Sequence, residues 1–313
     1  MERLRVVFFG SPAFAVPSLA AVAGQHDVVS VVTQPDRPAG RGKQLTAPPA
    51  KELALNLGLA VQQPTTLKTP AFVEGLAALR ADLFLVVAYG RILPQAVLDV
   101  PRLGPWNVHG SLLPRYRGAA PIQWSIIRGD SKTGICIMRM EAGLDTGPVA
   151  ASVATAIADE DTAGTLAARL AEMGAALLVD TIARIAEGSA AVIPQDHSQA
   201  TLAPMLKKED GWLDFSAPAR EVSARARGVD PWPGPMAALD GEPIKLFAPR
   251  VVPLQGTPGV VLSAGADGLV VACGRDAVAF GELQLPGRKR LPAAAVLAGR
   301  PIPAGTQLTR PAL

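Results

Sequence analysis

The first half of the chain alternates short apolar runs with helical patterns, and this alternation constrains the fold more than any other feature. The apolar runs have the length and the β-branched content of strands, and they cover residues 4–9, 28–34, 83–90, 106–110 and 133–140. Helical patterns lie between them at residues 15–24 and 50–58. Strands of this kind, separated by helices, predict an α/β fold with a parallel-rich sheet and helices on both of its faces.

The second half of the chain has a different texture. An Ala- and Leu-rich helical pattern runs from 161 to 188, and the preceding DEDT stretch can cap its start. Residues 188–204 show no period and predict a linker or an extended crossing segment. Beyond Lys207, a helical stretch is followed by short β-rich runs broken by Gly and Pro, which predict a small β-barrel or sandwich. We expect a first domain over 1–189, a linker over 190–207 and a smaller β domain over 208–313.

Composition predicts the class of protein and its compartment. The 313 residues suffice for two domains, and 49% hydrophobic with 18% charged residues indicate a globular protein. No apolar run approaches the roughly 20 residues of a membrane helix, and the N-terminal stretch MERLRVVFFG lacks a signal-peptide cleavage site. Cys136 and Cys273 have no metal-ligand spacing. We expect reduced thiols in a cytoplasmic protein that does not bind membranes.

The charge of the chain is unevenly distributed. Basic and acidic residues are equal in number up to residue 204, so the net charge of +3 arises wholly from residues 205–313. Positive charge in this last third suits a polyanionic partner, and it is equally compatible with an ordinary protein surface. Charge alone leaves both interpretations open.

A polar pair precedes a loop rich in Pro, Arg and Gly. Asn107 and His109 are two residues apart on a predicted strand, so their side chains share a face. The chain has only three histidines, and an imidazole titrates near neutral pH. In a parallel sheet, ligands bind at the carboxyl ends of the strands, which places Gly10, Tyr89, Gly90 and His109 at one rim. Dinucleotide binding is poorly supported, since the turn at Gly10 lacks the GxGxxG pattern.

A long basic loop follows the second predicted strand. Residues 34–49 (QPDRPAGRGKQLTAPP) contain four prolines and two glycines, so they do not form a helix or the interior of a sheet. The loop carries Arg37, Arg41 and Lys43 against a single acidic residue, Asp36. Loops of this length are often functional, and contact with phosphates is one interpretation. A solvated excursion without a partner is the other.

Asp145 lies in a turn between Gly143 and Gly147. An aspartate in such a turn commonly caps its own backbone. Alternatively, a carboxylate near His109 would set the tautomer of the imidazole, and Asn, His and Asp together can stabilise an oxyanion and move a proton. No nucleophile elbow is present, and the histidines lack the spacing of a zinc site, so we expect no metal. His26 and His197 are expected at the surface.

These segments resemble a known family. NVHGSLLPRYRGAAPI (107–122) and GLDTG (143–147) resemble the signature of the folate-dependent formyltransferases. Similar segments extend over nearly the whole chain, namely FFGSPAFAVPSL, TQPDRPAGRGK, VVAYGRILP, KKEDGWLDFS, DPWPG and LQLPGRK. The basic loop and the C-terminal segments narrow the resemblance to the bacterial methionyl-tRNA formyltransferases.

The resemblance implies a fold and a reaction. It implies a Rossmann-like N-terminal domain that binds 10-formyltetrahydrofolate, and an OB-like C-terminal β-barrel that contacts tRNA. The reaction would transfer the formyl group to the α-amino group of methionine on initiator methionyl-tRNA, for translation initiation. A monomer is the state that the resemblance implies.

The resemblance also implies roles for individual residues. By motif position, the catalytic residues would be Asn107, His109 and Asp145. Folate would lie along the loop and strand end formed by Ser111, Leu112, Leu113, Pro114, Tyr89 and Gly90. The loop at 35–49 would contact the tRNA acceptor arm through Arg37, Arg41 and Lys43.

The chain departs from the family pattern at four positions. Gly110 stands where alanine is expected, Tyr116 where tryptophan is common, and Pro148 where an acidic residue often follows. None of these replaces a catalytic group. Met205 stands where lysine is usual, which removes one candidate phosphate contact from the linker.

Other functions account for fewer of these features. A formyltransferase acting on an amino-sugar nucleotide should lack the basic loop, and a glycinamide ribonucleotide formyltransferase should be a single shorter domain. A formyltetrahydrofolate hydrolase would not need the C-terminal domain. A non-catalytic RNA-binding module leaves Asn107, His109 and Asp145 unexplained. A nicotinamide-dependent oxidoreductase lacks its glycine fingerprint.

Overall fold

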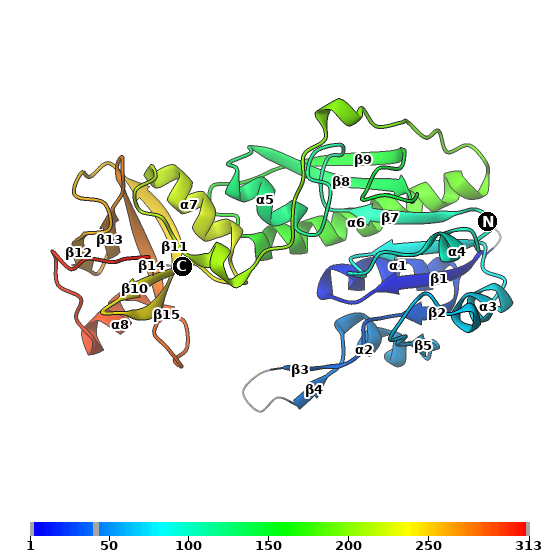
Figure 1. Ribbon diagram of the computed structural model, residues 1–313, viewed down its shortest axis with the longest axis horizontal. Coiled ribbons are helices and arrows are strands. Elements are labelled where there is room, and N and C mark those ends of the chain that lie inside the picture. Colours follow the sequence, from blue (N-terminus) through cyan, green and yellow to red (C-terminus); the bar gives the residue numbers. More distant parts are fainter. Residues whose placement is uncertain (1–2, 40–43, 311–313) are drawn as a thin grey trace. The chain divides into compact units, whose positions relative to one another are not determined.

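The predicted apolar runs of the first half lie in one sheet of seven strands (Figure 1). The computed structural model describes residues 3–39 and 44–310. Across the sheet the order is β5-β2-β1-β6-β7-β8-β9. The strands are β1 (Arg5–Gly10), β2 (Asp27–Val32), β5 (Val61–Gln62), β6 (Leu83–Val87), β7 (Pro105–His109), β8 (Lys132–Arg139) and β9 (Val149–Ala156).

The sheet is parallel from β5 to β7, as predicted, and its direction changes at β8. Pairings β2–β5, β1–β2, β1–β6 and β6–β7 are parallel, whereas β7 and β8 are antiparallel, with His109 opposite Cys136. The sheet is therefore parallel-rich, as predicted, with a change of direction at β8. The only helix between β7 and β8 is α5 (Pro121–Ile127), about 10 Å long, too short to run back along a five-residue strand of about 17 Å.

Helices of the first half follow the predicted positions, with additions. The predicted α1 (Val16–Gln25), α2 (Pro49–Asn56) and α6 (Ala163–Ala186) are present, and α3 (Pro70–Ala78) and α4 (Gln95–Leu98) were not predicted. The predicted cap of α6 is real, because the hydroxyl of Thr162 accepts the backbone N–H of Thr165 at 3.1 Å. Phe9, Phe84 and Tyr89 pack together in the core beside the sheet.

The basic loop contains a short hairpin. β3 (Arg37–Ala39) pairs antiparallel with β4 (Gln44–Thr46) as a two-stranded ribbon separate from the main sheet. The sequence predicted a loop because prolines exclude a sheet interior. A two-stranded ribbon has no interior strand, so Pro38 needs no second ladder partner.

The last third forms a curled antiparallel sheet, as predicted. Its order is β10-β11-β14-β13-β12, and β15 pairs with β14. The elements are α7 (Ala219–Gly228), β10 (Met236–Leu239), β11 (Glu242–Val252), β12 (Val261–Gly265), β13 (Gly268–Ala272), β14 (Ala277–Gln284), β15 (Leu291–Pro292) and α8 (Ala293–Gly299). Thr309 bridges Ala238 at one edge, and Gln307 bridges Val260 beside the other, so residues 307–309 join the two edges. Phe215 and Phe280 pack edge to face in the core.

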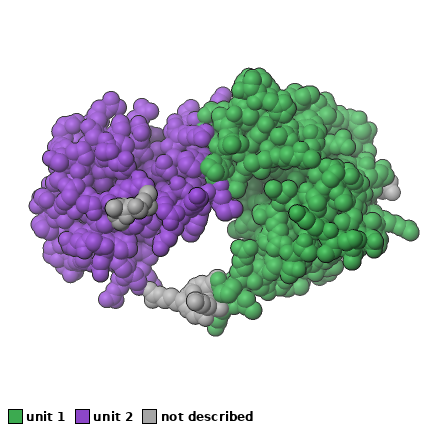
Figure 2. All heavy atoms as spheres, viewed as in Figure 1, with its two compact units in different colours: residues 1–121, 133–155, 167–204 green, residues 122–132, 156–166, 205–313 purple. Residues whose placement is uncertain are grey.

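The described residues fall into two compact units (Figure 2). Unit 1 draws on residues 1–121, 133–155 and 167–204, and unit 2 on residues 122–132, 156–166 and 205–313. The main sheet belongs to unit 1 and the curled sheet to unit 2. Among the described helices, none is long and apolar enough to cross a membrane.

Candidate functional site

The carboxyl ends of three parallel strands meet at one edge of the main sheet. Gln34 ties this edge together, because its side-chain amide donates to the carbonyl of Tyr89 at 3.0 Å and its backbone N–H donates to the hydroxyl of Ser11 at 2.9 Å. Gly10 ends β1, and a Cβ there would lie 2.9 Å from the carbonyl oxygen of Val87. Gly10 is thus explained by close packing and not by phosphate binding.

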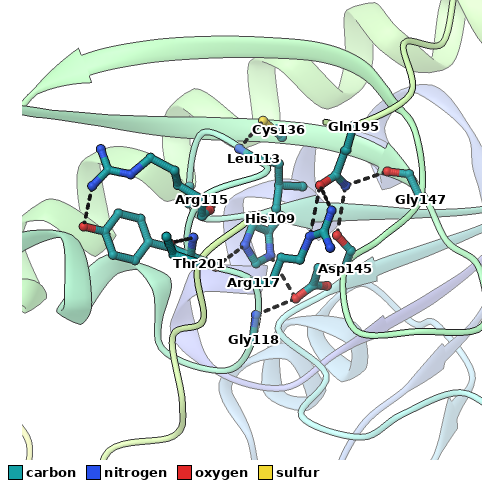
Figure 3. A network of polar contacts seen from close by, with 12 residues as sticks. His109, Leu113, Arg115, Arg117, Gly118, Cys136, Asp145, Gly147, Gln195 and Thr201 are labelled. Atoms are coloured by element: carbon teal, nitrogen blue, oxygen red, sulfur yellow. Dashed lines mark hydrogen bonds and ion pairs between the residues drawn. The ribbon is translucent and has the colours of Figure 1, made fainter. Parts of the chain in front are cut away.

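His109 ends β7 and has a polar partner at each ring nitrogen (Figure 3). Nε2 lies 2.9 Å from the carbonyl oxygen of Tyr116, and Nδ1 lies 3.7 Å from a carboxylate oxygen of Asp145. A carbonyl oxygen only accepts hydrogen bonds, so Nε2 carries the hydrogen. In the neutral ring, Nδ1 is then the nitrogen without a hydrogen, and it faces the Asp145 carboxylate.

Asp145 links the imidazole to the loop after β7. Its Oδ2 accepts the backbone N–H of Gly118 at 2.8 Å. The residue has a φ of +52°, in the left-handed region that aspartate tolerates better than most residues. Gly147 follows closely, and a Cβ at that position would run into the backbone carbonyl of Arg139. The structure therefore brings His109 and Asp145 together, as expected, and Asn107 is half-buried two residues earlier on the same strand.

The loop after β7 is held from inside and from the neighbouring strand. The hydroxyl of Ser111 donates to the carbonyl of Arg115 at 2.7 Å, and the N–H of Leu113 contacts Sγ of Cys136 at 3.4 Å. Burial raises the pKa of the Cys136 thiol to about 11. This cysteine is therefore a neutral packing residue and not a nucleophile.

The residues expected to contact folate differ in their exposure to solvent. The ring of Tyr89 is buried in the core against Phe9, so only its backbone faces the edge. Gly90 is exposed, with a φ of +80°. Ser111 is buried, and Leu112, Leu113 and Pro114 are half-buried. These positions remain predicted folate contacts.

A set of polar residues that the sequence did not reveal supports the loop. Thr201 accepts the N–H of Tyr116 through its hydroxyl at 2.9 Å, and its carbonyl accepts the N–H of Arg117 at 2.8 Å. Gln195 contacts Arg117 and the turn at Asp145. Gln195 and Thr201 lie in the predicted linker, where no period marked them. Arg117 lies within the signature-like segment 107–122. Its position in this segment is the one sequence feature that marks it as a candidate site residue.

His26 and His197 were both expected at the surface, and only His197 is found there. His26 was expected at the surface, but only 4% of it is exposed, and its Nδ1 accepts the N–H of Leu4 at 3.4 Å. The sequence pattern misjudged it because His26 directly follows α1 and is covered by the start of β1. His197 is exposed, as expected, and its Nδ1 lies 3.0 Å from a guanidinium nitrogen of Arg117.

The basic loop is anchored at its base. Asp36 pairs with Lys51 at 2.8 Å and accepts the amide of Gln63 at 2.8 Å. Hydrogen bonds from Lys51 and Gln63 hold the pKa of Asp36 below its ordinary value. Arg37 is exposed on β3, whereas Arg41 and Lys43 lie outside the described residues. Over residues 3–39 and 44–310, no cluster of His, Cys, Asp and Glu side chains is able to hold a metal ion.

Comparison with known proteins decides the family. Residues 4–182 match the formyl transferase family, and residues 205–301 match its C-terminal domain. The chain is 48% identical to the methionyl-tRNA formyltransferase of Desulfotalea psychrophila over 98% of its own length and 96% of that protein. It is 49% identical to that of Sorangium cellulosum, over 98% of this chain and 100% of that protein. This chain belongs to the methionyl-tRNA formyltransferase family.

A solved structure shares the fold. This chain superposes on HypX from Aquifex aeolicus, solved in complex with tetrahydrofolic acid, with a TM-score of 0.67 and 16% identity. The match covers 99% of this chain and 51% of HypX. The match to the formyl transferase family, over residues 4–182, contains Gly10, Tyr89, His109 and Asp145.

Proposed function

We propose that this chain transfers the formyl group of 10-formyltetrahydrofolate to the α-amino group of methionine on initiator methionyl-tRNA. The observation that carries the proposal is the His109–Asp145 pair at the carboxyl edge of the sheet, within segments shared with the family. The chain is 48% and 49% identical to two methionyl-tRNA formyltransferases over nearly its whole length, which favours tRNA over other formyl acceptors. The proposed reactants are soluble, which fits a cytoplasmic enzyme.

The proposed chemistry begins with attack of the neutral amine on the formyl carbon. The carbonyl oxygen becomes an oxyanion as the new C–N bond forms. The Asn107 amide and a protonated His109 Nδ1 donate hydrogen bonds to this oxyanion. The 3.7 Å separation between Nδ1 and Asp145 is longer than a hydrogen bond, so a donor at Nδ1 remains available to the substrate. One such donor contributes about 100- to 1000-fold to kcat.

Collapse of the intermediate then breaks the bond to the folate nitrogen. The attacking amine loses a proton and N10 of the folate gains one, so the overall reaction needs no external acid or base. The protonated Nδ1 of His109 gives its proton to N10 and recovers one from the attacking amine, while the Asp145 carboxylate 3.7 Å away orients the ring. No step requires a covalent enzyme intermediate or a metal.

The proposed substrates occupy different features. Folate lies along Ser111 to Pro114 and the backbone at Tyr89 and Gly90. The acceptor arm of the tRNA contacts the basic loop through Arg37, Arg41 and Lys43. Basic residues within 205–313 contact tRNA phosphates, and the protein acts as a monomer.

Acceptor choice tests the proposed function. The protein is incubated with labelled 10-formyltetrahydrofolate and one of three acceptors, methionyl initiator tRNA, methionyl elongator tRNA or an amino-sugar nucleotide, or with buffer alone. We expect label on the initiator tRNA alone. Label on the sugar nucleotide, or release of free formate in every sample, would support the proposed folate site and refute tRNA as the formyl acceptor.

A further inference from the structure

An arginine is buried beside the proposed catalytic pair. Only 7% of Arg117 is exposed. Its Nε and Nη2 donate to Oε1 of Gln195 at 3.1 and 2.7 Å, and Nη2 lies 3.0 Å from Nδ1 of His197. Both partners are neutral when His197 is unprotonated. A buried guanidinium usually pairs with a carboxylate, so this arrangement suggests that Arg117 is placed to orient the amide.

Gln195 transmits this orientation to the turn that carries Asp145. Its Nε2 donates to the backbone carbonyls of Asp145 at 2.9 Å and Gly147 at 2.7 Å (Figure 3). One amide thus uses its oxygen on Arg117 and both hydrogens on the turn. Gln195 itself is buried, with 9% of its surface exposed. Buried amides in such arrangements are restricted to one orientation, because a flipped amide would place donors against donors.

The turn needs this support. Asp145 adopts a φ of +52°, and Gly147 packs directly on the carbonyl of Arg139. Among the contacts described, the carboxylate has one backbone anchor, the N–H of Gly118, on its Oδ2. The two bonds from Gln195 fix the main chain on both sides of Thr146, and so fix the direction in which the Asp145 side chain leaves the backbone.

We propose that Gln195, oriented by Arg117, is a positioning residue that sets the distance and angle between Asp145 and His109. It contacts neither ring nitrogen of His109 and acts only through the 145–147 turn. This inference rests on the proposed function, since it assigns catalysis to the pair that Gln195 positions. A displacement of about 1 Å in a catalytic group can lower a rate about 100-fold.

Two variants separate the parts of the interaction. Gln195→Glu keeps an acceptor for Arg117 and adds an ion pair, but it removes both donors to the turn. Gln195→Leu removes all polar contacts at similar volume, and it serves if the charged variant does not fold. Gln199→Leu is the matched control, because Gln199 is exposed in the same segment and bonds only Asp196 among the contacts described.

Kinetics and histidine NMR provide independent readouts. We expect Gln195→Glu to lower kcat about 10- to 100-fold, with KM for both substrates within about twofold, when it is measured at a temperature where the variant is fully folded. Since the chain has three histidines, ¹⁵N-histidine spectra resolve each ring, and His109→Ala identifies the His109 signals. We expect the His109 signals to shift in Gln195→Glu and to stay in place in Gln199→Leu.

Each result decides the inference. A normal kcat in Gln195→Glu and Gln195→Leu would overturn it, as would a loss confined to KM, which indicates substrate contact. A lower kcat with unmoved His109 signals would also overturn it, because the effect would not pass through the pair. If the wild-type protein transfers no formyl group, the proposed function fails, and the NMR comparison still tests whether Gln195 positions His109.

Discussion

His109 has one nitrogen committed to the backbone and one available for proton transfer. The Tyr116 carbonyl fixes the hydrogen on Nε2, so Nδ1 becomes the site where a proton is gained or lost. Asp145 lies 3.7 Å from that site. The backbone of the loop therefore selects the tautomer. A carboxylate partner often both fixes the tautomer and orients the ring, whereas here the Tyr116 carbonyl fixes the tautomer and Asp145 orients the ring.

Replacement of His109 tests this division at the level of one residue. We expect His109→Ala to lower kcat about 100- to 10,000-fold, because it removes both a donor and a proton carrier. Binding of tetrahydrofolate and of tRNA should change little, since the side chain is buried at the strand end. Single-turnover kinetics and calorimetric titration with tetrahydrofolate measure the two effects. A variant that retains kcat and loses affinity would make His109 a binding residue.

A second buried histidine predicts a pH dependence of stability. Burial, and next the charge of Arg3, lowers the pKa of His26 below its ordinary value of 6.5. The unfolded chain therefore takes up a proton at a pH where the folded chain does not, and stability falls as the pH drops below about 6.5. The slope is at most about 1.4 kcal/mol per pH unit. Denaturant unfolding between pH 8 and 5.5 should show a shallower dependence in His26→Asn than in the wild type; parallel curves would contradict the assignment.

The sequence revealed the residues of the site that follow local rules. Asn107 and His109 share a face because strands have a period of two, and Asp145 stood out between two glycines. Arg117, Gln195 and Thr201 could not be found this way. Gln195 meets Arg117 across 78 positions of the chain, in a segment with no helical or strand period. Such contacts depend on the tertiary fold and leave no local pattern.

At the scale of elements, long and strongly apolar segments were predicted and short ones were missed. β6 is fully buried, and the sequence showed it as a continuous apolar run. β5 has two residues and α4 has four, which is too few for a period to appear. The direction of β8 was also beyond local patterns, because parallel and antiparallel buried strands have the same composition.

The hairpin in the basic loop is the element expected to engage tRNA. Its base is fixed by the Asp36–Lys51 pair, so the charge of Asp36 is already paired. We expect Arg41→Ala to raise KM for methionyl-tRNA about tenfold and to leave the slow hydrolysis of 10-formyltetrahydrofolate unchanged. Lys68→Ala, an exposed lysine outside the loop, is the matched control. An equal loss in both reactions would instead assign the loop to folate.

At the scale of the whole molecule, the surplus of positive charge and the proposed chemistry lie in different segments of the chain. The main sheet carries the proposed catalytic residues, whereas the excess of basic residues falls within 205–313. Exposed basic residues of unit 2 include Lys207, Lys208, Arg288 and Lys289. Arg290 differs, because it pairs with Asp230 and Glu282 and stacks on Phe247. Arg290 is therefore paired within the unit, whereas the exposed Arg288 and Lys289 are placed to contact a polyanion.

This distribution predicts a salt dependence of tRNA binding. Each phosphate contact releases counterions, so the logarithm of the association constant should fall linearly with the logarithm of salt concentration. We expect Lys289→Gln to weaken binding and to reduce that slope by about one, as for the loss of one phosphate contact. Arg300→Gln is the control, since Arg300 already lies 3.7 Å from Glu242. Filter binding over about 50 to 300 mM salt measures both slopes. A flat response in the wild type would show that unit 2 does not bind tRNA through its basic surface, and the excess charge would then be an ordinary surface property.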